Sequence, residues 1–437
     1  MFFTRRAFFS LFLAILFSTL PFLPFESRAQ SETPEIKKTS LDLPKNMGEF
    51  ELIKISLLNK MPEALIETSS PFKVTDRDGR PLFQGDRIVS TAIRPSPGGI
   101  KIGSLSFSQT PLTIQSEGGS IKVDQYAYRH ALKIWRDSGK ALSVVNEIDL
   151  EDYLKGVLPW EANPEWSVEV LKAQAVASRT FALFKAIENQ KKRYAVSKGV
   201  LSQVYGGKNL EDPKTDKAIE ATRGEILTYD GKIFPAYFHS TCGGKTTQAE
   251  YLWDVEAHPA LKGVTCDFCR SSKHYKWEAE LTKAEIEKKL KKHRINVPGI
   301  RGLAATQKDA SGRAKKFEIE YAGGKKKIHS NDFRIWMDPA KLRSTLIYAI
   351  YDEGDHFRLK GRGWGHGVGM CQFGAKQLSD LGYSYREILE YYYPGSAIRQ
   401  LKDSDVPIPD VPPDLKKEED TERKSGWKAW LQDLFDL

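Results

Sequence analysis

The spacing of apolar and polar residues predicts a β-rich region after residue 50. Short apolar runs alternate there with turn residues, which is typical of strands. These runs occupy 51–58, 71–75, 87–90, 99–102, 112–114 and 121–123. The following segment, 131–145, has the pattern of a hairpin that turns at Asp137-Ser138-Gly139. A β-rich N-terminal part is therefore expected up to about residue 149.

A long helix is predicted immediately afterwards. Ser167 is a good N-cap residue, and the segment that follows is apolar nearly all round, so the helix should be central and buried. Lys172, Gln174 and Arg179 interrupt its apolar surface, and buried polar groups need partners, so we expect a polar network around it.

Glu161 lies just before this helix. Pro159 and Pro164 flank it and oppose a helix through this point, so the pattern predicts a fixed loop. Trp160 and Trp166 are close by, and an indole against the carboxyl group would raise the pKa of Glu161. The alternative is a core helix with a few polar residues at its edge and no catalytic role for Glu161.

The remaining chain alternates strands and helices irregularly. A short helix is predicted at 213–222, strands at 224–229 and 233–239, and helices after residue 375 and over 384–393. Without a regular βαβ period, α+β is the expected fold class. Residues 275–350 have the pattern of an insertion, with a charged helix at 283–294 and a basic hairpin whose turns fall at 309–312 and 323–324.

Both ends of the chain carry their own signals. Arg5-Arg6 precede an apolar run to Phe22 and a small-x-small site at 27–29, which predicts a secretory signal peptide, or an uncleaved anchor as the alternative. We therefore expect an exported protein of the periplasm or cell envelope. The predicted parts are 1–29 signal peptide, 30–47 flexible lead-in, 48–149 β-rich part, 150–400 core with the 275–350 insertion, 401–426 Pro-rich linker and 427–437 amphipathic helix. That last helix suits a membrane surface or a partner groove, or packing against its own domain.

Composition narrows the class of partner. Hydrophobic residues make up 40% of the 437 residues and charged residues 28%, as in soluble globular proteins. The net charge of +9 favours an anionic surface or polymer. Lys and Arg are scattered and accompany no nucleic-acid-binding motif, so no nucleic acid partner is expected.

Two further motifs could carry chemistry. His239, Cys242, Cys266 and Cys269 have a spacing that suits a closed, structural zinc site, with a disulfide among the cysteines as the alternative. A glycine-rich segment, 361–369, surrounds His366 but lacks the ending of a phosphate loop. His366 could bind sugar, orient Glu161, relay a proton or be a structural histidine.

Four segments resemble the sporulation stage II protein D/LytB family. They are YLKGVLPWEANPEWSVEVLKAQAVASRTFAL, SQVYGG, PAYFHSTCGGKTTQAEYLW and GRGWGHGVGMCQFGAKQLSDLGYSYREILEYYYPGSAI, and they follow the family's order over about 150–398. The family includes peptidoglycan lytic transglycosylases and amidase enhancers, so the resemblance implies a peptidoglycan glycan strand as substrate. The family's catalytic glutamate falls on Glu161, where Trp160 replaces a residue that is often small and polar.

The resemblance also implies a set of roles. Glu161 would act as general acid and then base on the MurNAc–GlcNAc bond without a cofactor for catalysis, because the sugar's own 6-hydroxyl is the nucleophile. Residues expected to bind glycan or orient Glu161 are Lys172, Gln174, Arg179, Gln203, Tyr205, Ser240, Trp364, His366 and Gln372. The alternative is a non-catalytic glycan-binding module that activates a peptidoglycan amidase.

Overall fold

The computed structural model describes residues 36–44, 52–197 and 205–401. The predicted signal peptide, the Pro-rich linker, the C-terminal amphipathic helix and Gln203 lie outside these residues. The described chain is 25% helical and 40% strand, which confirms the α+β class. Within these ranges, no helix is long and apolar enough to cross a membrane.

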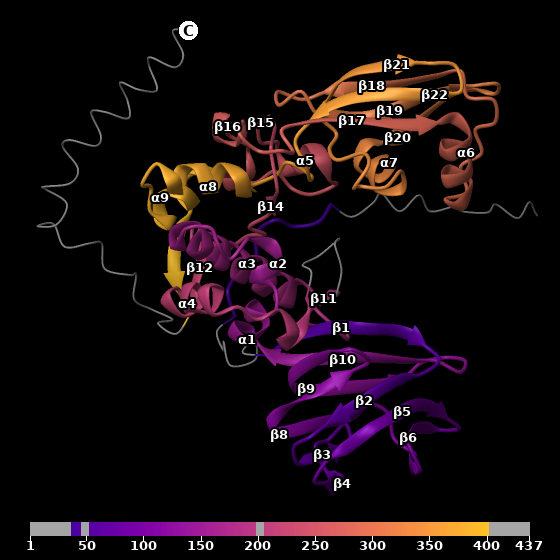
Figure 1. Ribbon diagram of the computed structural model, residues 1–437, viewed down its shortest axis with the longest axis vertical. Coiled ribbons are helices and arrows are strands. Elements are labelled where there is room, and N and C mark those ends of the chain that lie inside the picture. The colour runs from indigo at the N-terminus through magenta and orange to yellow at the C-terminus, as the bar shows by residue number, and fades with distance from the viewer. Residues whose placement is uncertain (1–35, 45–51, 198–204, 402–437) are drawn as a thin grey trace, which may run out of the picture. The chain divides into compact units, whose positions relative to one another are not determined.

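A large, mainly antiparallel sheet forms the N-terminal part, and only β11 joins it in parallel, along β1 (Figure 1). Its main path runs β11-β1-β10-β9-β8-β2-β5-β6-β7, and β3 joins β8 and carries β4. The strands are β1 (Leu52–Met61), β2 (Ala64–Thr68), β3 (Phe72–Thr75), β4 (Pro81–Gly85), β5 (Ile88–Ser96), β6 (Gly99–Ile102), β7 (Leu105–Phe107), β8 (Leu112–Val123), β9 (Tyr126–Arg136), β10 (Leu142–Asp149) and β11 (Val196–Ser197). The predicted hairpin at 131–145 is confirmed, since Leu142 pairs with Arg136.

One prediction in this sheet was wrong. The apolar runs at 112–114 and 121–123 belong to the single strand β8, not to two strands. Between them the pairing with β9 shifts register from Gln115 to Ser120. Gly118 adopts a positive φ of 68° inside this irregularity, which a glycine tolerates without strain. The interruption of the apolar pattern therefore marks an irregular stretch of one strand and not its end.

The predicted long helix is α3 (Val168–Glu188), and it is buried over most of its circumference. It packs against α1 (Leu150–Lys155), α4 (Pro213–Ala221), α8 (Gln372–Asp380), α9 (Tyr385–Tyr392) and β12 (Glu225–Tyr229). Ser167 is its N-cap residue, but the serine side chain makes no capping hydrogen bond and instead contacts the Ser379 hydroxyl on α8. Contacts on every side explain why the helix lacks a polar face.

The segment around Glu161 differs from the predicted loop. Leu158–Glu161 forms a single helical turn, α2, and the Ala162 N–H donates to the Leu158 carbonyl to close it. Pro159 is tolerated because the first positions of a helix need no N–H donor. Pro164 lies beyond the end of the turn. The two prolines thus limit the length of the helix without preventing it.

The short elements that follow α3 in the chain complete this part of the structure. They are η2 (Gly207–Leu210), β13 (Lys232–Ile233), β14 (Phe238–His239), β15 (Gly244–Lys245), α5 (Ala249–Leu252), η3 (Pro259–Leu261), β16 (Thr265–Cys266), η4 (Asp267–Cys269), β23 (Met370–Cys371) and β24 (Ala397–Gln400). β14 pairs in parallel with β23, so chain segments separated by more than 100 residues meet there. This pairing brings the glycine-rich segment next to the cysteine motif.

The predicted insertion folds around a hydrophobic core of its own (Figure 1). It contains two three-stranded sheets, β17-β22-β21 and β18-β19-β20, with two helices. The elements are β17 (Lys276–Thr282), α6 (Lys283–Lys292), β18 (Gly302–Lys308), β19 (Ala314–Tyr321), β20 (Gly324–His329), α7 (Ser330–Trp336), β21 (Ile347–Asp352) and β22 (His356–Arg362). Phe357 and Leu359 of β22 belong to this core, so the substructure extends past residue 350.

Candidate catalytic site and cysteine cluster

The backbone of Glu161, at the end of α2, is held by one glutamine side chain, which a second glutamine positions. The Gln372 side-chain amide, on α8, donates to the Glu161 carbonyl at 3.0 Å and to Gln174 Oε1, on α3, at 3.3 Å. Gln174 in turn donates to the Ser178 hydroxyl at 3.1 Å. Both glutamines are buried, so they fix the backbone of Glu161 and do not present themselves to a ligand. The Glu161 side chain itself is only half-buried.

A layer of tyrosines lies behind Glu161. Tyr153 of α1 is fully buried, and burial followed by the negative charge of Glu161 raises the pKa of its hydroxyl. The ring of Tyr205 lies 5.2 Å from that of Tyr153, and its hydroxyl donates to Asn146 Oδ1 at 2.8 Å. The prediction that Tyr205 binds glycan is therefore not supported, because only 1% of its surface is exposed.

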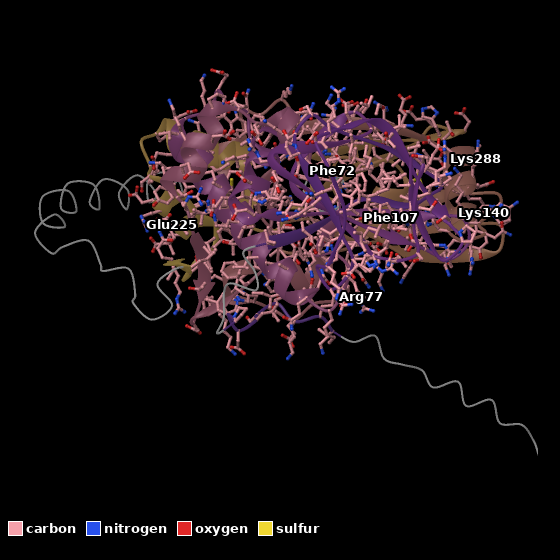
Figure 2. The ribbon with its side chains drawn as sticks, turned by 90° about the horizontal axis from the view of Figure 1, so that it is seen from below. Phe72, Arg77, Phe107, Lys140, Glu225 and Lys288 are labelled. Carbon is pink, nitrogen blue, oxygen red and sulfur yellow. The ribbon has the colours of Figure 1, made fainter. Side chains whose placement is uncertain are left out.

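Arg179 also differs from its predicted role in glycan binding. Its side chain is fully buried and forms two hydrogen bonds with the Glu151 carboxylate, at 2.8 and 2.7 Å. It also donates to the carbonyls of Ile219 and of Glu225, a residue labelled in Figure 2. Glu151 additionally accepts the Gly224 N–H at 3.0 Å. This buried ion pair ties α1, α3 and the start of β12 together and has no surface left for a ligand.

Lys172 and Ser240 have structural contacts of their own. Lys172 forms an ion pair with Glu169 at 2.9 Å and lies over the ring of Tyr385, on the side of α3 that faces α9. The Ser240 carbonyl accepts the Phe373 N–H at 3.0 Å and so anchors the first turn of α8. These contacts account for the positions of both residues, and their expected roles in glycan binding stay predictions.

Aromatic side chains line the region around α2 and α8. Trp160 is 60% exposed. The indole environment expected at the Glu161 carboxyl group stays a prediction. Trp166 packs edge-on against Phe373, with ring centroids 5.4 Å apart. The Phe373 ring lies 5.9 Å from that of His274, which in turn lies 4.3 Å from that of Trp364. Trp364 is therefore linked to the Glu161 region through neighbouring rings.

His366 is a packed, neutral histidine. Its Nδ1 accepts the Val368 N–H at 3.1 Å, and its ring lies among those of Tyr237, His239 and Trp253. Burial, followed by the positive charges of Arg334 and Arg313, lowers its pKa to about 3. A proton relay at neutral pH is disfavoured, and the surroundings support the structural role that the sequence left open.

The depressed pKa of His366 predicts a pH dependence of stability. The unfolded chain binds a proton at this residue below about pH 6.5, while the folded protein does not, so the free energy of unfolding should fall as the pH drops from 7 to 4. Glutamine does not titrate, so urea unfolding of His366→Gln should show a shallower fall. Parallel curves for the two proteins would contradict the assignment of a neutral His366.

Four cysteines come together at the start of α8. The Sγ atoms of Cys242, Cys266, Cys269 and Cys371 all lie within 4.8 Å of one another, and all four residues are buried. None of the four is in a disulfide, so the disulfide alternative is not realised. Tetrahedral zinc with Zn–S bonds of about 2.3 Å separates its sulfurs by roughly 3.8 Å, a size that this cluster matches. The donor set suits a closed, structural site.

The fourth ligand position was predicted wrongly. Cys371 completes the cluster, whereas His239, which pairs with it across β14 and β23, points its Nδ1–H at the Val368 carbonyl. Cys371 stands about 100 residues after the Cys266-x-x-Cys269 motif, so local spacing could not reveal it. Its position directly after the glycine-rich segment was the available signal.

N–H groups that point at sulfur atoms, together with one buried arginine, would stabilise thiolates bound to a metal cation. The Cys242 N–H points at Cys371 Sγ at 3.2 Å, and the Gly244 N–H points at Cys242 Sγ at 3.4 Å. Hydrogen bonds from the neighbouring thiols lower the pKa of Cys269, whereas burial raises that of Cys371. The fully buried Arg313 donates to the Cys242 carbonyl at 2.5 Å, so its positive charge would offset the negative charge of four thiolates bound to a divalent metal.

The glycine-rich segment makes room for this arrangement. A side chain at Gly367 would begin 2.3 Å from Nε of Arg313, and one at Gly369 only 1.9 Å from the Tyr237 carbonyl oxygen. Both residues also have positive φ values, 89° and 68°. Close packing around Arg313 and the cluster therefore accounts for both glycines, and no contact between their backbone and a ligand is needed to explain them.

We expect the cluster to hold one structural zinc ion. Replacing Cys371 with serine should remove most of the metal and lower the thermal midpoint, because a thiolate ligand is lost. The replacement His239→Gln should leave the metal content unchanged. Metal analysis of protein purified without chelator distinguishes the two variants. Equal zinc content in wild type and Cys371→Ser would contradict the four-cysteine assignment.

Sequence comparisons place the chain among known proteins. The family described as stage II sporulation protein matches residues 138–229, and a domain of unknown function matches residues 249–369. The chain is 30% identical over 271 residues to stage II sporulation protein D of Bacillus subtilis, covering 59% of this chain and 76% of that protein. The chain belongs to the stage II sporulation protein D/LytB family.

Two other relatives extend this comparison. An uncharacterized protein of Brachyspira hyodysenteriae is 37% identical over 253 residues, covering 58% of this chain and 67% of that protein. The amidase enhancer of Bacillus subtilis is 27% identical over 343 residues. That match covers 65% of this chain but only about half, 48%, of the amidase enhancer.

Proposed function

We propose that this protein is an exported lytic transglycosylase that cleaves the glycan strands of peptidoglycan. The observation that carries the proposal is the placement of Glu161, the residue that matches the family's catalytic glutamate. It is half-buried at the end of α2, and its backbone is fixed by Gln372 and Gln174. A catalytic acid needs a fixed position and access to its substrate, and a held backbone with a partly exposed side chain supports this role.

The proposed reaction uses one carboxyl group twice. Protonated Glu161 donates its proton to the oxygen of the MurNAc–GlcNAc bond, and the bond between that oxygen and C1 of the muramyl residue breaks. The muramyl 6-hydroxyl then attacks C1 and returns its proton to the Glu161 carboxylate. The products are a free 4-hydroxyl on one strand and a 1,6-anhydro ring on the other, and no water is consumed.

The test is mass spectrometry of soluble products. Mature protein is incubated with purified glycan strands, with and without stem peptides. Products that carry 1,6-anhydromuramyl ends would support the proposal. Products with reducing ends would indicate hydrolysis instead, and no products from folded protein on either substrate would overturn the enzymatic role.

A second function is favoured by one observation, the similarity to an amidase enhancer. Under this alternative the protein binds glycan without cleaving it and stimulates a peptidoglycan amidase. Release of stem peptides by an added amidase measures this effect. Stimulation that is equal for wild type and Glu161→Gln would support the alternative, because it would be independent of the acid.

Location and metal complete the proposal. The paired arginines and apolar run at the N-terminus support export to the periplasm or cell envelope, either free or anchored. The cysteine cluster would hold zinc as a structural element beside α8, with no part in the reaction. A predicted contact of residues 427–437 with a membrane or a partner protein belongs to the same proposal.

A further inference from the structure

The positive charge of this chain is concentrated in one substructure. Residues 276–362, from β17 to β22, contain 21 Lys and Arg against 12 Asp and Glu, a net charge of +9. The whole chain also has a net charge of +9, so the remaining residues are neutral in sum. A substructure that carries all of the excess charge would attract anionic polymers.

A β-bulge brings two tyrosines onto one face of the β17-β22-β21 sheet. Ile347 pairs with Gly361 and Ala349 pairs with Lys360, so Tyr348 is an extra residue on β21. Residues three apart normally lie on opposite faces of a strand. The bulge instead lets Tyr348 and Tyr351 share the outward face, where they are 50% and 46% exposed.

Cationic side chains of β22 lie over these rings. The Arg362 guanidinium is 5.7 Å from the ring centroid of Tyr348, and that of Arg358 is 5.1 Å from Tyr351. Arg343 lies 5.1 Å from the ring of Trp364. Arg358 is paired with Glu353, but among the described residues no carboxylate is in ion-pair distance of Arg343 or Arg362. These two cations remain available to an anionic ligand.

A series of ring contacts leads from the end of β22 to the neighbourhood of Glu161. Trp364 follows Arg362 by two residues, and its ring contacts His274, which contacts Phe373. Phe373 is the neighbour of Gln372, whose amide holds the Glu161 carbonyl. We name Tyr351, Tyr348, Arg362, Arg343 and Trp364 the aromatic–cationic track. Ring contacts and direct chain connections therefore link the track to the proposed catalytic site.

We propose that the aromatic–cationic track binds the glycan strand beyond the sugars held at Glu161, and that it recognises the carboxylates of that strand. The proposal rests on the proposed function for its substrate class. Exposed aromatic rings offer flat apolar surfaces for sugar rings, and the two arginines offer bidentate donors for carboxylates. A peptide-free muramyl strand presents both features in repeat, because its lactyl carboxylates are free, whereas a chitin strand presents only the neutral sugar.

The experiment measures binding and not cleavage. The background is Glu161→Gln, with fluorescently labelled peptide-free glycan strands and chitin oligosaccharides of similar length as probes. In this background, Arg343→Ser/Arg362→Ser removes the two available cations of the track. The matched control, Arg77→Ser/Arg80→Ser, removes two exposed arginines between β3 and β4, where Figure 2 labels Arg77. A third variant, Tyr348→Ser/Tyr351→Ser, removes the rings.

We expect the track arginine variant to raise the Kd for glycan strands about tenfold and to leave chitin binding within twofold. The tyrosine variant should weaken both probes, and the control neither. If the track arginine variant and the control variant lose equal affinity for glycan strands, the effect is one of overall charge and the proposal is overturned. Unchanged binding in both track variants would overturn it as well. Because no turnover is required, failure of wild-type protein to form anhydro products would overturn the enzymatic role and leave this result standing.

Discussion

The variant Glu161→Gln should form almost no 1,6-anhydromuramyl products, with a rate at least about 10³-fold below that of wild type. Glutamine keeps the size of the side chain but has no proton to donate to the glycosidic oxygen and no carboxylate to accept one from the 6-hydroxyl. The Gln372 contact is made by the Glu161 backbone carbonyl, so it should persist in the variant. Mass spectrometry of soluble products over time measures the loss.

Glu165→Gln is a matched control for this variant. Glu165 lies four residues later, its side chain is 72% exposed, and it pairs with Lys214 at the surface. Removing that charge should leave product formation within twofold of wild type and the stability nearly unchanged. If Glu161→Gln has the thermal midpoint of wild type and still forms anhydro products, Glu161 is not the catalytic acid.

Breaking the buried Glu151–Arg179 pair should have the largest effect on stability. Arg179→Met leaves the charge of the Glu151 carboxylate uncompensated in the interior, and the carbonyls of Glu225 and Ile219 each lose the hydrogen bond from Arg179. We expect the free energy of unfolding to fall by about 3–5 kcal/mol. Urea unfolding followed by circular dichroism measures the change, and zinc is kept saturating so that metal loss does not contribute.

An exposed pair of the same geometry is the control. Arg223 also makes two hydrogen bonds with one carboxylate, that of Glu220, but both side chains are nearly half exposed. Arg223→Met should cost less than about 1 kcal/mol. In the double variant Glu151→Leu/Arg179→Met, part of the loss should be recovered because no buried charge remains. A loss below 1 kcal/mol in Arg179→Met, accompanied by weaker glycan binding, would restore the predicted role in substrate binding.

The site itself was only partly predictable from the sequence. Gln174 and Gln372 were expected near Glu161, and the structure joins them in one hydrogen-bonded chain. The family resemblance implies glycan-binding roles for Arg179 and Tyr205, whereas the structure pairs them with Glu151 and Asn146. A sequence displays which polar groups need partners, whereas the identity of each partner depends on which segments meet in the fold.

Local physical chemistry made several features of this chain readable from its sequence alone. The α+β class, the hairpin turning at 137–139, the buried helix after Ser167 and the turns of the insertion all follow from side-chain period and from turn residues. These signals act within about ten residues, where backbone sterics and the burial of one face decide the conformation. The family resemblance belongs to this same level, since it rests on short contiguous segments.

Only the tertiary structure decided the long-range groupings. The pairing of β14 with β23 brings Cys371 to the three other cysteines, and the bulge in β21 brings Tyr348 onto the face of Tyr351. The same holds for Glu151 and Arg179, which lie 28 residues apart on different helices. Such groupings depend on how apolar faces pack and where strands register, and these are properties of the whole fold that no local pattern of residues specifies.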